Sequence, residues 1–381
     1  MNSQSNSINV VEQRTSALKS QDTTEVPTFQ VITPQSISGA LLERWNQLRS
    51  QNKVYSSPYF DAEFTKAVGR VRDDVRIVVA EINGQIVGIL PFQENSRGHA
   101  VPAGGMLNDW HGILGKRSPE ILEQMLKAAN LQSFKFHSID NADRQLKKFV
   151  FREFDAHYLD LSDGWEAYRK WVFKHSSTVK RQGQKTRAME REIGPIRFEF
   201  DSENPDLLER LIKLKRTRYQ NSNTFDILGV SWAAELLREL HQVREPGFQG
   251  LLSVLWAGDE FIGAHFGLLT KDVLHYWFPV YDRRFHKYSP GTQLLMGSAE
   301  KACELGVPKL DLGYGDDDYK FKFCNAHEPV AFGVANFNPF TRALALQQYR
   351  LRNKLKEIPM KPLFKRVLRK FYPQFGGWNF R

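Results

Sequence analysis

Apolar and polar positions follow the same pattern in two hairpins along the chain. Residues 76–93 are two apolar strands joined at Asn83 and Gly84, which readily adopt the positive φ angles of a tight turn. Residues 252–268 repeat the pattern, and Gly88 in the first hairpin corresponds to Gly263 in the second. The sequence therefore predicts two related β-hairpins.

Each hairpin is followed by the same order of elements. A further strand-like stretch leads to a Ser-Pro helix start, at Ser118 and again at Ser289, then to an amphipathic helix and a final strand. We interpret this as two copies of one α/β unit. The predicted fold class is α/β (α+β), with tandem domains at residues 28–164 and 196–340, each a mixed central sheet flanked by helices.

The remaining segments differ from the two units in composition. Residues 1–27 are polar and without periodicity, which predicts disorder. Residues 165–195 are predicted to form a basic linker helix, and residues 341–381 a basic helical tail.

The turn that opens the helix of the second unit is the first candidate site. A helix N-terminus presents unpaired N–H groups and the positive end of a dipole, and a glycine there lets a phosphate approach the backbone. The same residues are a common helix-start signal, and this alternative stays open. The candidate residues for binding a phosphate-bearing carrier are Tyr281, Arg284, Lys287, Tyr288, Ser289, Gly291 and Thr292.

The two copies differ at this turn. The position of Gly291 is occupied in the first copy by Glu120, whose charge would repel a phosphate and whose side chain would obstruct it. We therefore expect only the second copy to bind the carrier.

Several motifs of the second copy resemble a known family. The order strand, turn, helix and strand is similar to the pyrophosphate-binding core of GNAT-type acyltransferases. The finer resemblance is to the CelD/BcsL-type acetyltransferases, named for cellulose biosynthesis and related to the Fem peptidyltransferases. It rests on Tyr281-Asp282, Ser289-Pro290-Gly291, Glu304 with Gly306, and Asp311, Gly315 and Tyr319-Lys320. The resemblance implies tandem GNAT-like domains and acyl-CoA, such as acetyl-CoA, as co-substrate.

Acidic and aromatic residues near the predicted strand ends are candidates for the chemistry of transfer. Asp282, Asp311 and Asp316 are the candidate general bases, although a structural role for Asp311 is equally open. Tyr319 is a candidate for protonating a leaving thiolate, and Lys320 for binding an anionic group. Asp317, in the same acidic loop, is a candidate contact for the acceptor. Gly313 and Tyr314 stand where relatives of this family carry an apolar residue and an arginine, so no arginine is assigned to the substrate there.

A polar-aromatic stretch of the first unit is the candidate acceptor site. Asp109, Trp110 and His111 interrupt an apolar run, and tryptophan faces commonly stack on sugars. A buried histidine and a core tryptophan are the alternative interpretation.

Composition narrows the class of protein. The chain has 381 residues, is 41% apolar and contains no apolar run long enough to span a membrane, and no secretory signal is visible at its N-terminus. Two cysteines without metal-ligand spacing indicate a reducing compartment and no metal site. We therefore expect a cytoplasmic protein.

The positive charge is concentrated in the tail. Residues 341–381 hold 11 basic residues against one acidic residue, and the rest of the chain balances at 42 of each. The tail either packs back onto the domain or contacts anionic lipid at the inner face of the membrane. The linker, with eight basic residues and one acidic residue between positions 168 and 191, is either a solvated helix or a surface for an anionic substrate or RNA.

The sequence predicts an acyl-CoA-dependent N- or O-acyltransferase. The resemblance adds an amino sugar or other saccharide precursor of an exopolysaccharide as acceptor. There are two alternatives. The first is a Fem-like transferase that uses charged tRNA, and it is the only one in which nucleic acid is a partner. The second is a non-catalytic scaffold of a polysaccharide synthase complex.

Overall fold

The computed structural model describes residues 26–95, 97–141, 144–222, 224–315 and 318–357. Almost all of the predicted disordered segment, residues 1–25, lies outside this part of the chain. So do the candidate residues Asp316 and Asp317, and the tail beyond residue 357.

Both predicted hairpins are present. The first consists of β2 (Val75–Ile82) and β3 (Gln85–Glu94), and the second of β10 (Phe248–Ala257) and β11 (Glu260–Thr270). Asn83 and Gly84 adopt φ angles of 51° and 75°, as the tight turn requires.

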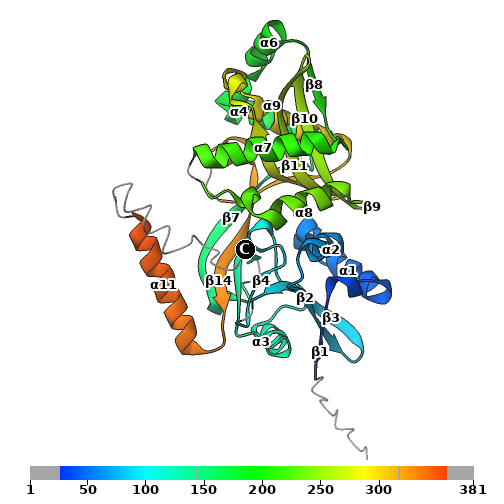
Figure 1. Cartoon of the computed structure of the whole chain (residues 1–381), viewed down its shortest axis with the longest axis vertical. Coiled ribbons are helices and arrows are strands. Elements are labelled where there is room, and N and C mark those ends of the chain that lie inside the picture. Colours follow the sequence, from blue (N-terminus) through cyan, green and yellow to red (C-terminus); the bar gives the residue numbers. More distant parts are fainter. Residues whose placement is uncertain (1–25, 96, 142–143, 223, 316–317, 358–381) are drawn as a thin grey trace, which may run out of the picture.

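One mixed sheet runs through both halves of the chain (Figure 1), in the order β1-β2-β3-β4-β6-β14-β7-β13-β12-β11-β10-β8. Helices cover both faces, which confirms the predicted fold class. The other strands are β1 (Thr28–Ile32), β4 (His99–Pro102), β5 (Leu114–Gly115), β6 (Ser133–Asp140), β7 (Val150–Asp160), β8 (Ile196–Glu199), β9 (Arg244–Glu245), β12 (Val273–Tyr281), β13 (Lys309–Tyr314) and β14 (Ala326–Ala335).

The two halves exchange their last strands. β14, from the second half, pairs with β6 of the first, while β7, from the first half, pairs with β13 of the second. β7 and β14 also pair with each other at the centre of the sheet. The exchange makes each half depend on a strand of the other, and the domain boundary expected near residue 164 stays a prediction.

Both predicted Ser-Pro helix starts are present, since α3 begins at Pro119 and α9 begins at Pro290. Ser118 and Asn204 cap α3 and α7 by accepting hydrogen bonds from the backbone N–H groups of Ile121 and Asp206. The α-helices outside the linker are α1 (Gly39–Ser50), α2 (Ala62–Val71), α3 (Pro119–Ala128), α7 (Pro205–Asn221), α8 (Ser231–Gln242), α9 (Pro290–Glu304), α10 (Lys320–Phe323) and α11 (Pro339–Glu357). The 3₁₀ turns are η1 (Pro34–Ser36), η2 (Lys53–Ser56), η3 (Pro58–Phe60), η4 (Gly105–Leu107), η5 (Lys147–Phe149), η6 (Ile227–Gly229) and η7 (Arg283–Tyr288).

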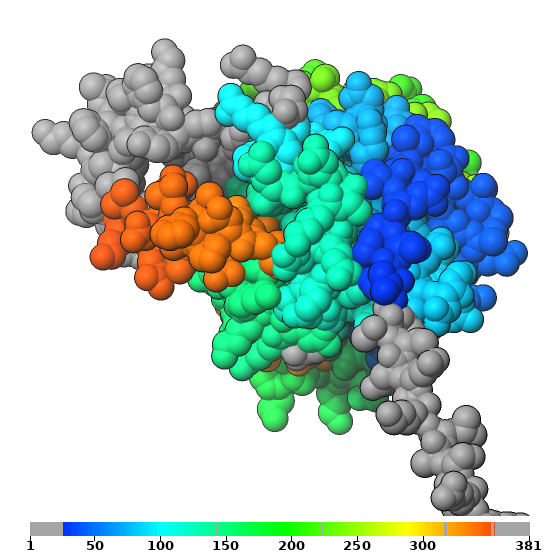
Figure 2. All heavy atoms as spheres, turned by 90° about the horizontal axis from the view of Figure 1, so that it is seen from below, coloured from blue at the N-terminus to red at the C-terminus, as the bar shows by residue number. Residues whose placement is uncertain are grey.

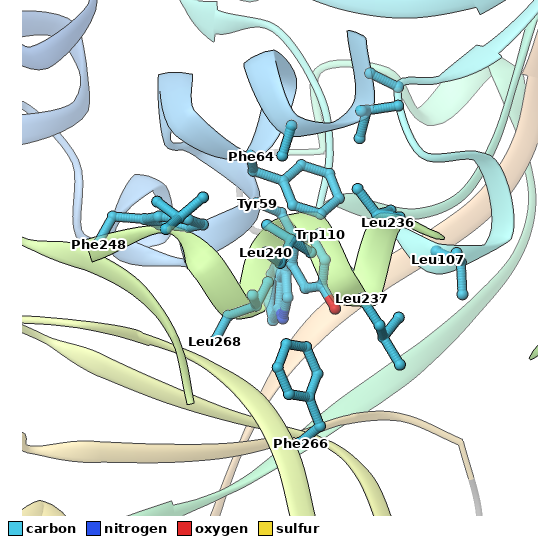
Figure 3. Close-up of a cluster of buried hydrophobic side chains, with 14 of the residues drawn as sticks. Tyr59, Phe64, Leu107, Trp110, Leu236, Leu237, Leu240, Phe248, Phe266 and Leu268 are labelled. Carbon is cyan, nitrogen blue, oxygen red and sulfur yellow. The ribbon is translucent and has the colours of Figure 1, made fainter. Parts of the chain in front are cut away.

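One cluster of the hydrophobic core contains residues of both halves. In Figure 3, Leu236, Leu237 and Leu240 of α8 lie close to Tyr59 and Phe64, which belong to the first half. Burying each large apolar side chain contributes about 1.5–3 kcal/mol, so this shared core stabilises one arrangement of the two halves. The functional side chains described below lie along the same junction.

The predicted linker helix is three helices in the structure. They are α4 (Trp165–His175), α5 (Ser177–Lys180) and α6 (Gln182–Glu192), separated at Ser176 and Arg181. Because α6 is a separate helix, it packs against η7 and the turn that follows it. The basic linker is therefore part of the surroundings of that turn.

α11 forms the described part of the predicted helical tail. Figure 2 shows it at the edge of the molecule, against the first half. Within the described residues, no helix combines the length and apolar character required to cross a membrane.

Candidate active site

Two neighbouring strands of the second half separate at the centre of the molecule. β12 and β13 run parallel but pair only from Val273 to His275 and from Lys309 to Asp311. Beyond these positions β12 continues to Tyr281 without pairing to β13. The separation leaves an edge of β12 against which an extended ligand can lie.

The turn at the start of α9 follows the open end of β12. Ser289 adopts a left-handed conformation with φ of 54° and does not cap the helix; its Oγ instead contacts Lys185 Nζ of α6 at 2.5 Å. A side-chain carbon at Gly291 would meet only the ring of Tyr281, at 3.5 Å. The backbone at Gly291 is therefore accessible beside a lysine that the sequence analysis did not single out.

Two of the predicted carrier-binding cations are held by carboxylates. Arg284 donates to Asp282 at 2.9 Å, and Lys287 donates to Glu192 at 2.6 Å. The side-chain hydroxyl of Tyr288 also donates to Glu192. Arg284 and Lys287 therefore stabilise η7 in this structure, and their role in carrier binding stays a prediction.

The other predicted residues of this region surround the turn. Tyr281 contacts His286 through its hydroxyl at 3.0 Å, and the backbone N–H of Thr292 donates to Ser289. Asp282 caps η7, and its hydrogen bonds with Arg284 lower its pKa even though partial burial acts to raise it. The side-chain contacts of Asp282 thus lie in the turn and not at Asp311.

A buried polar network crosses from one half to the other where β12 and β13 separate. The Oδ2 atom of Asp311 accepts hydrogen bonds from Trp110 Nε1 at 2.7 Å and is 3.3 Å from His275 Nδ1. Its Oδ1 accepts from the backbone of Gly313 at 2.9 Å. The other ring nitrogen of His275, Nε2, is 3.2 Å from Asp109 Oδ2. His275 thus lies between the two carboxylates of Asp109 and Asp311. Asp109 and Trp110 come from the first half of the chain, and His275 and Asp311 come from the second.

The carboxylates decide the charge of His275. Burial disfavours the imidazolium, but Asp109 and Asp311 outweigh burial and raise the pKa of His275 to about 9. Burial likewise acts to raise the pKa of Asp311, but the hydrogen bond and charge of His275 lower it below its usual value. His275 is therefore charged at neutral pH.

This arrangement predicts a pH dependence of stability. Because the pKa of His275 rises from about 6.5 in the unfolded chain to about 9, its contribution is complete below pH ~6.5 and is lost as pH rises through 9. We expect wild type to lose on the order of 3 kcal/mol of unfolding free energy between pH 6 and 10 relative to a His275→Gln variant. Urea unfolding of both proteins at pH 6 and pH 10 measures this difference. Equal losses of unfolding free energy in wild type and His275→Gln would contradict the prediction.

Asp109 is the accessible end of the network. Its side chain is 22% exposed, whereas His275 and Asp311 are fully buried. Gly313, with φ of 69°, leaves room for it, since a side-chain carbon there would lie 2.9 Å from Asp109 Oδ2. Tyr59 packs edge-on against His275 at 5.0 Å between ring centroids. Asp109 is therefore the one carboxylate of this network that is partly exposed, and it forms an ion pair with His275.

Trp110 and His111 are buried among protein groups. Trp110 is buried, so its ring offers no face to a ligand in this structure, and its Nε1 donates to Asp311. His111 Nε2 accepts hydrogen bonds from the backbone of His137 and Ser138, each at 3.2 Å. Burial lowers the pKa of His111 well below its usual value, with a further contribution from His137. The structure thus places these two residues in supporting positions.

His111 also fills the corresponding opening of the first half. β4 and β6 pair at His99 and Ala100 and then separate, and the bridge from His111 to Ile139 occupies the space between them. This is a second physical reason, besides Glu120, to expect a carrier only in the second half.

Lys320 and Tyr319 follow β13. Lys320 is 3% exposed and donates to the carbonyl oxygens of Gly313 and Tyr314, at 3.2 and 2.6 Å. Tyr319 is partly exposed. Lys320 therefore fixes the end of β13, and the catalytic role of either residue stays a prediction.

Sequence reasoning missed His275 and Lys185. A histidine within the apolar strand 273–281 was the available signal for the first, because a buried imidazole requires polar partners. The signal for Lys185 was only the general basicity of the linker. Among the described residues, no group of three or more histidine, cysteine, aspartate or glutamate side chains is placed to hold a metal ion.

Part of the chain matches a known protein family. Residues 174–321 match the family model described as an acetyltransferase (GNAT) domain. No curated protein matches the sequence. Among solved structures, FemX is similar, with a TM-score of 0.51 and 12% identity over 84% of this chain and 100% of that chain.

Two further structures have TM-scores of 0.48. A tandem GNAT protein from the clavulanic acid biosynthesis pathway is 9% identical over 82% of this chain and 99% of its own. The C-terminal domain of a protein described as a lysylphosphatidylglycerol synthetase, from Agrobacterium fabrum, is 14% identical over 81% and 96%. Residues 174–321 thus match the model of an acetyltransferase (GNAT) domain, and the fold of the chain is similar to that of FemX.

Proposed function

We propose that the chain is an acyl-CoA-dependent acyltransferase that transfers the acyl group directly from the thioester to an amine or hydroxyl. The observation that supports this most is the coincidence of three features: the separated strands β12 and β13, the accessible turn at Gly291, and Asp109 held by His275. The family model of a GNAT domain, which matches residues 174–321 and so includes β12, β13 and Gly291 but not Asp109, supports an acyl-CoA donor.

The turn and α6 would hold the phosphates of the carrier. The positive end of the α9 dipole and the backbone N–H of Gly291 favour an anion, and Lys185 adds a positive charge at Ser289. The pantetheine chain would lie along the free edge of β12. This places the thioester near His275 and Asp109, where the strands separate.

Asp109 would accept the proton of the acceptor. As the acceptor nitrogen or oxygen attacks the thioester carbon, its proton passes to the Asp109 carboxylate, and the bond from carbon to sulfur breaks. The thiolate then takes a proton, for which Tyr319 is the candidate donor. His275 and Asp311 orient Asp109, as a positioned partner orients a general base.

We propose an amino sugar or another saccharide precursor as the acceptor, on the sequence resemblance to the CelD/BcsL-type enzymes. A charged tRNA is a second candidate donor, favoured by the basic α6 beside the turn and by the fold shared with FemX. Acyl-CoA and charged tRNA both carry phosphates, so binding experiments must compare the affinity of the protein for each of them.

Replacing Lys185 tests the carrier site. We expect Lys185→Gln to weaken acetyl-CoA binding about tenfold, because a charge-assisted contact to a phosphate is lost. Lys174→Gln, an exposed lysine of α4 with the same change of charge, is the control. Titration calorimetry with acetyl-CoA measures both. Equal affinities of the two variants for acetyl-CoA would remove Lys185 from the site. Tight binding of charged tRNA, without binding of acetyl-CoA, would favour charged tRNA as the donor.

A further inference from the structure

α11 has apolar side chains on two opposite sides. One side packs on the sheet: Tyr349 stacks on Phe332 of β14, with 5.0 Å between ring centroids, and contacts Phe151 of β7. Arg342, on the same side, lies over the ring of Phe149. These contacts explain why the helix is held against the first half.

The other side of α11 faces away from the protein. Phe340, Leu344 and Leu351 are spaced by four and seven positions, so they lie on one side of the helix. They are 86%, 55% and 61% exposed. We call these three residues the outer stripe. Single exposed apolar residues are common on proteins, but three aligned on one helix indicate an interaction surface.

Charge identifies the kind of partner. Arg350 and Lys354 are exposed on α11, which contains five basic residues and one acidic residue, Glu357. The chain continues for 24 residues after α11 with six basic and no acidic residues, and it includes six aromatic residues. A second copy of the chain would bring two positive tails together, whereas an anionic lipid surface complements both the charge and the apolar stripe.

We propose that the outer stripe of α11 and its flanking basic residues dock the protein on an anionic lipid surface. The helix lies in the headgroup region with the stripe buried and with Arg350 and Lys354 at the phosphates. α11 lies at the edge of the molecule (Figure 2), and the side chains of the outer stripe are exposed. This inference is independent of the proposed catalytic activity.

Vesicle flotation of the full chain tests the proposal. We expect wild type to float with vesicles of phosphatidylcholine containing roughly one third phosphatidylglycerol, and not with phosphatidylcholine alone. A Leu344→Glu, Leu351→Glu double variant is expected to partition at least about tenfold more weakly. Arg350→Gln or Lys354→Gln is expected to weaken binding about fivefold each.

A matched variant separates a docking surface from a general effect of charge. Phe173→Glu with Leu305→Glu changes two exposed apolar residues away from α11 and should partition as wild type does, and thermal melting checks that all variants fold. Wild type that does not float with the anionic vesicles would overturn the proposal. So would a stripe variant that floats like wild type. Loss of a wild-type dimer in the stripe variant, in place of vesicle binding, would assign the surface to a second copy.

Discussion

Replacing Asp109 by asparagine is expected to lower kcat/KM for acyl transfer by about 10²- to 10⁴-fold, the range of a lost general base. The amide retains the size of the side chain but cannot accept the proton of the attacking group. Thiol release from acetyl-CoA in the presence of amines, amino sugars and hydroxyl acceptors measures the effect.

The same variant has an internal control. Asp109 lies at the separation of β12 and β13, not at the turn, so acetyl-CoA should bind Asp109→Asn and wild type with equal affinity. Asp282→Asn, which changes a carboxylate that caps η7, is expected to retain most turnover. Full activity of Asp109→Asn would remove Asp109 as the base and return Asp316, outside the described residues, to consideration.

Replacing Asp311 by alanine is expected to destabilise the protein by about 3–5 kcal/mol. The substitution leaves a buried histidine without one of its carboxylate partners and removes the acceptor of Trp110 Nε1 and of the Gly313 N–H. Urea denaturation followed by tryptophan fluorescence measures the loss.

Two variants set the scale for this loss. Asp282→Ala removes a helix cap near the surface and should cost only about 1 kcal/mol. Trp110→Phe keeps the aromatic ring but removes the donor to Asp311, so its cost should lie between the two. If Asp311→Ala is no more destabilising than Asp282→Ala, the network does not hold the halves together.

The hairpins and helix starts were predictable because their signals are local. A turn such as Asn83 and Gly84, or a cap such as Ser118, depends on residues within a few positions of one another. The repetition of these signals was enough to predict two α/β units.

The active-site network was not predictable by the same reasoning. Trp110 and Asp311 are bonded although 201 positions separate them, and the exchange of β7 and β14 helps bring their halves together. Strand patterning indicates which face of a strand is buried, but not which strand lies beside it. Asp311 was therefore identified as a candidate, while its partner His275 was not.

The predicted carrier residues show a second limit of sequence reasoning. Arg284 and Lys287 belong to the turn in sequence, but Asp282 and Glu192 already occupy them. Lys185 is about 100 positions from Ser289 and contacts it through the packing of α6. Charge near a motif thus does not establish which side chain is available to a ligand.

Titration calorimetry of the full chain with acetyl-CoA, in wild type and in Gly291→Ala and Gly291→Glu variants, tests whether the turn at Gly291 binds the carrier. We expect saturable binding by wild type and nearly equal binding by Gly291→Ala, whose added carbon would meet only the Tyr281 ring. We expect loss of binding in Gly291→Glu, which introduces the residue of the first half. No binding of any acyl-CoA by wild type, or unchanged binding by Gly291→Glu, would contradict carrier binding at this turn.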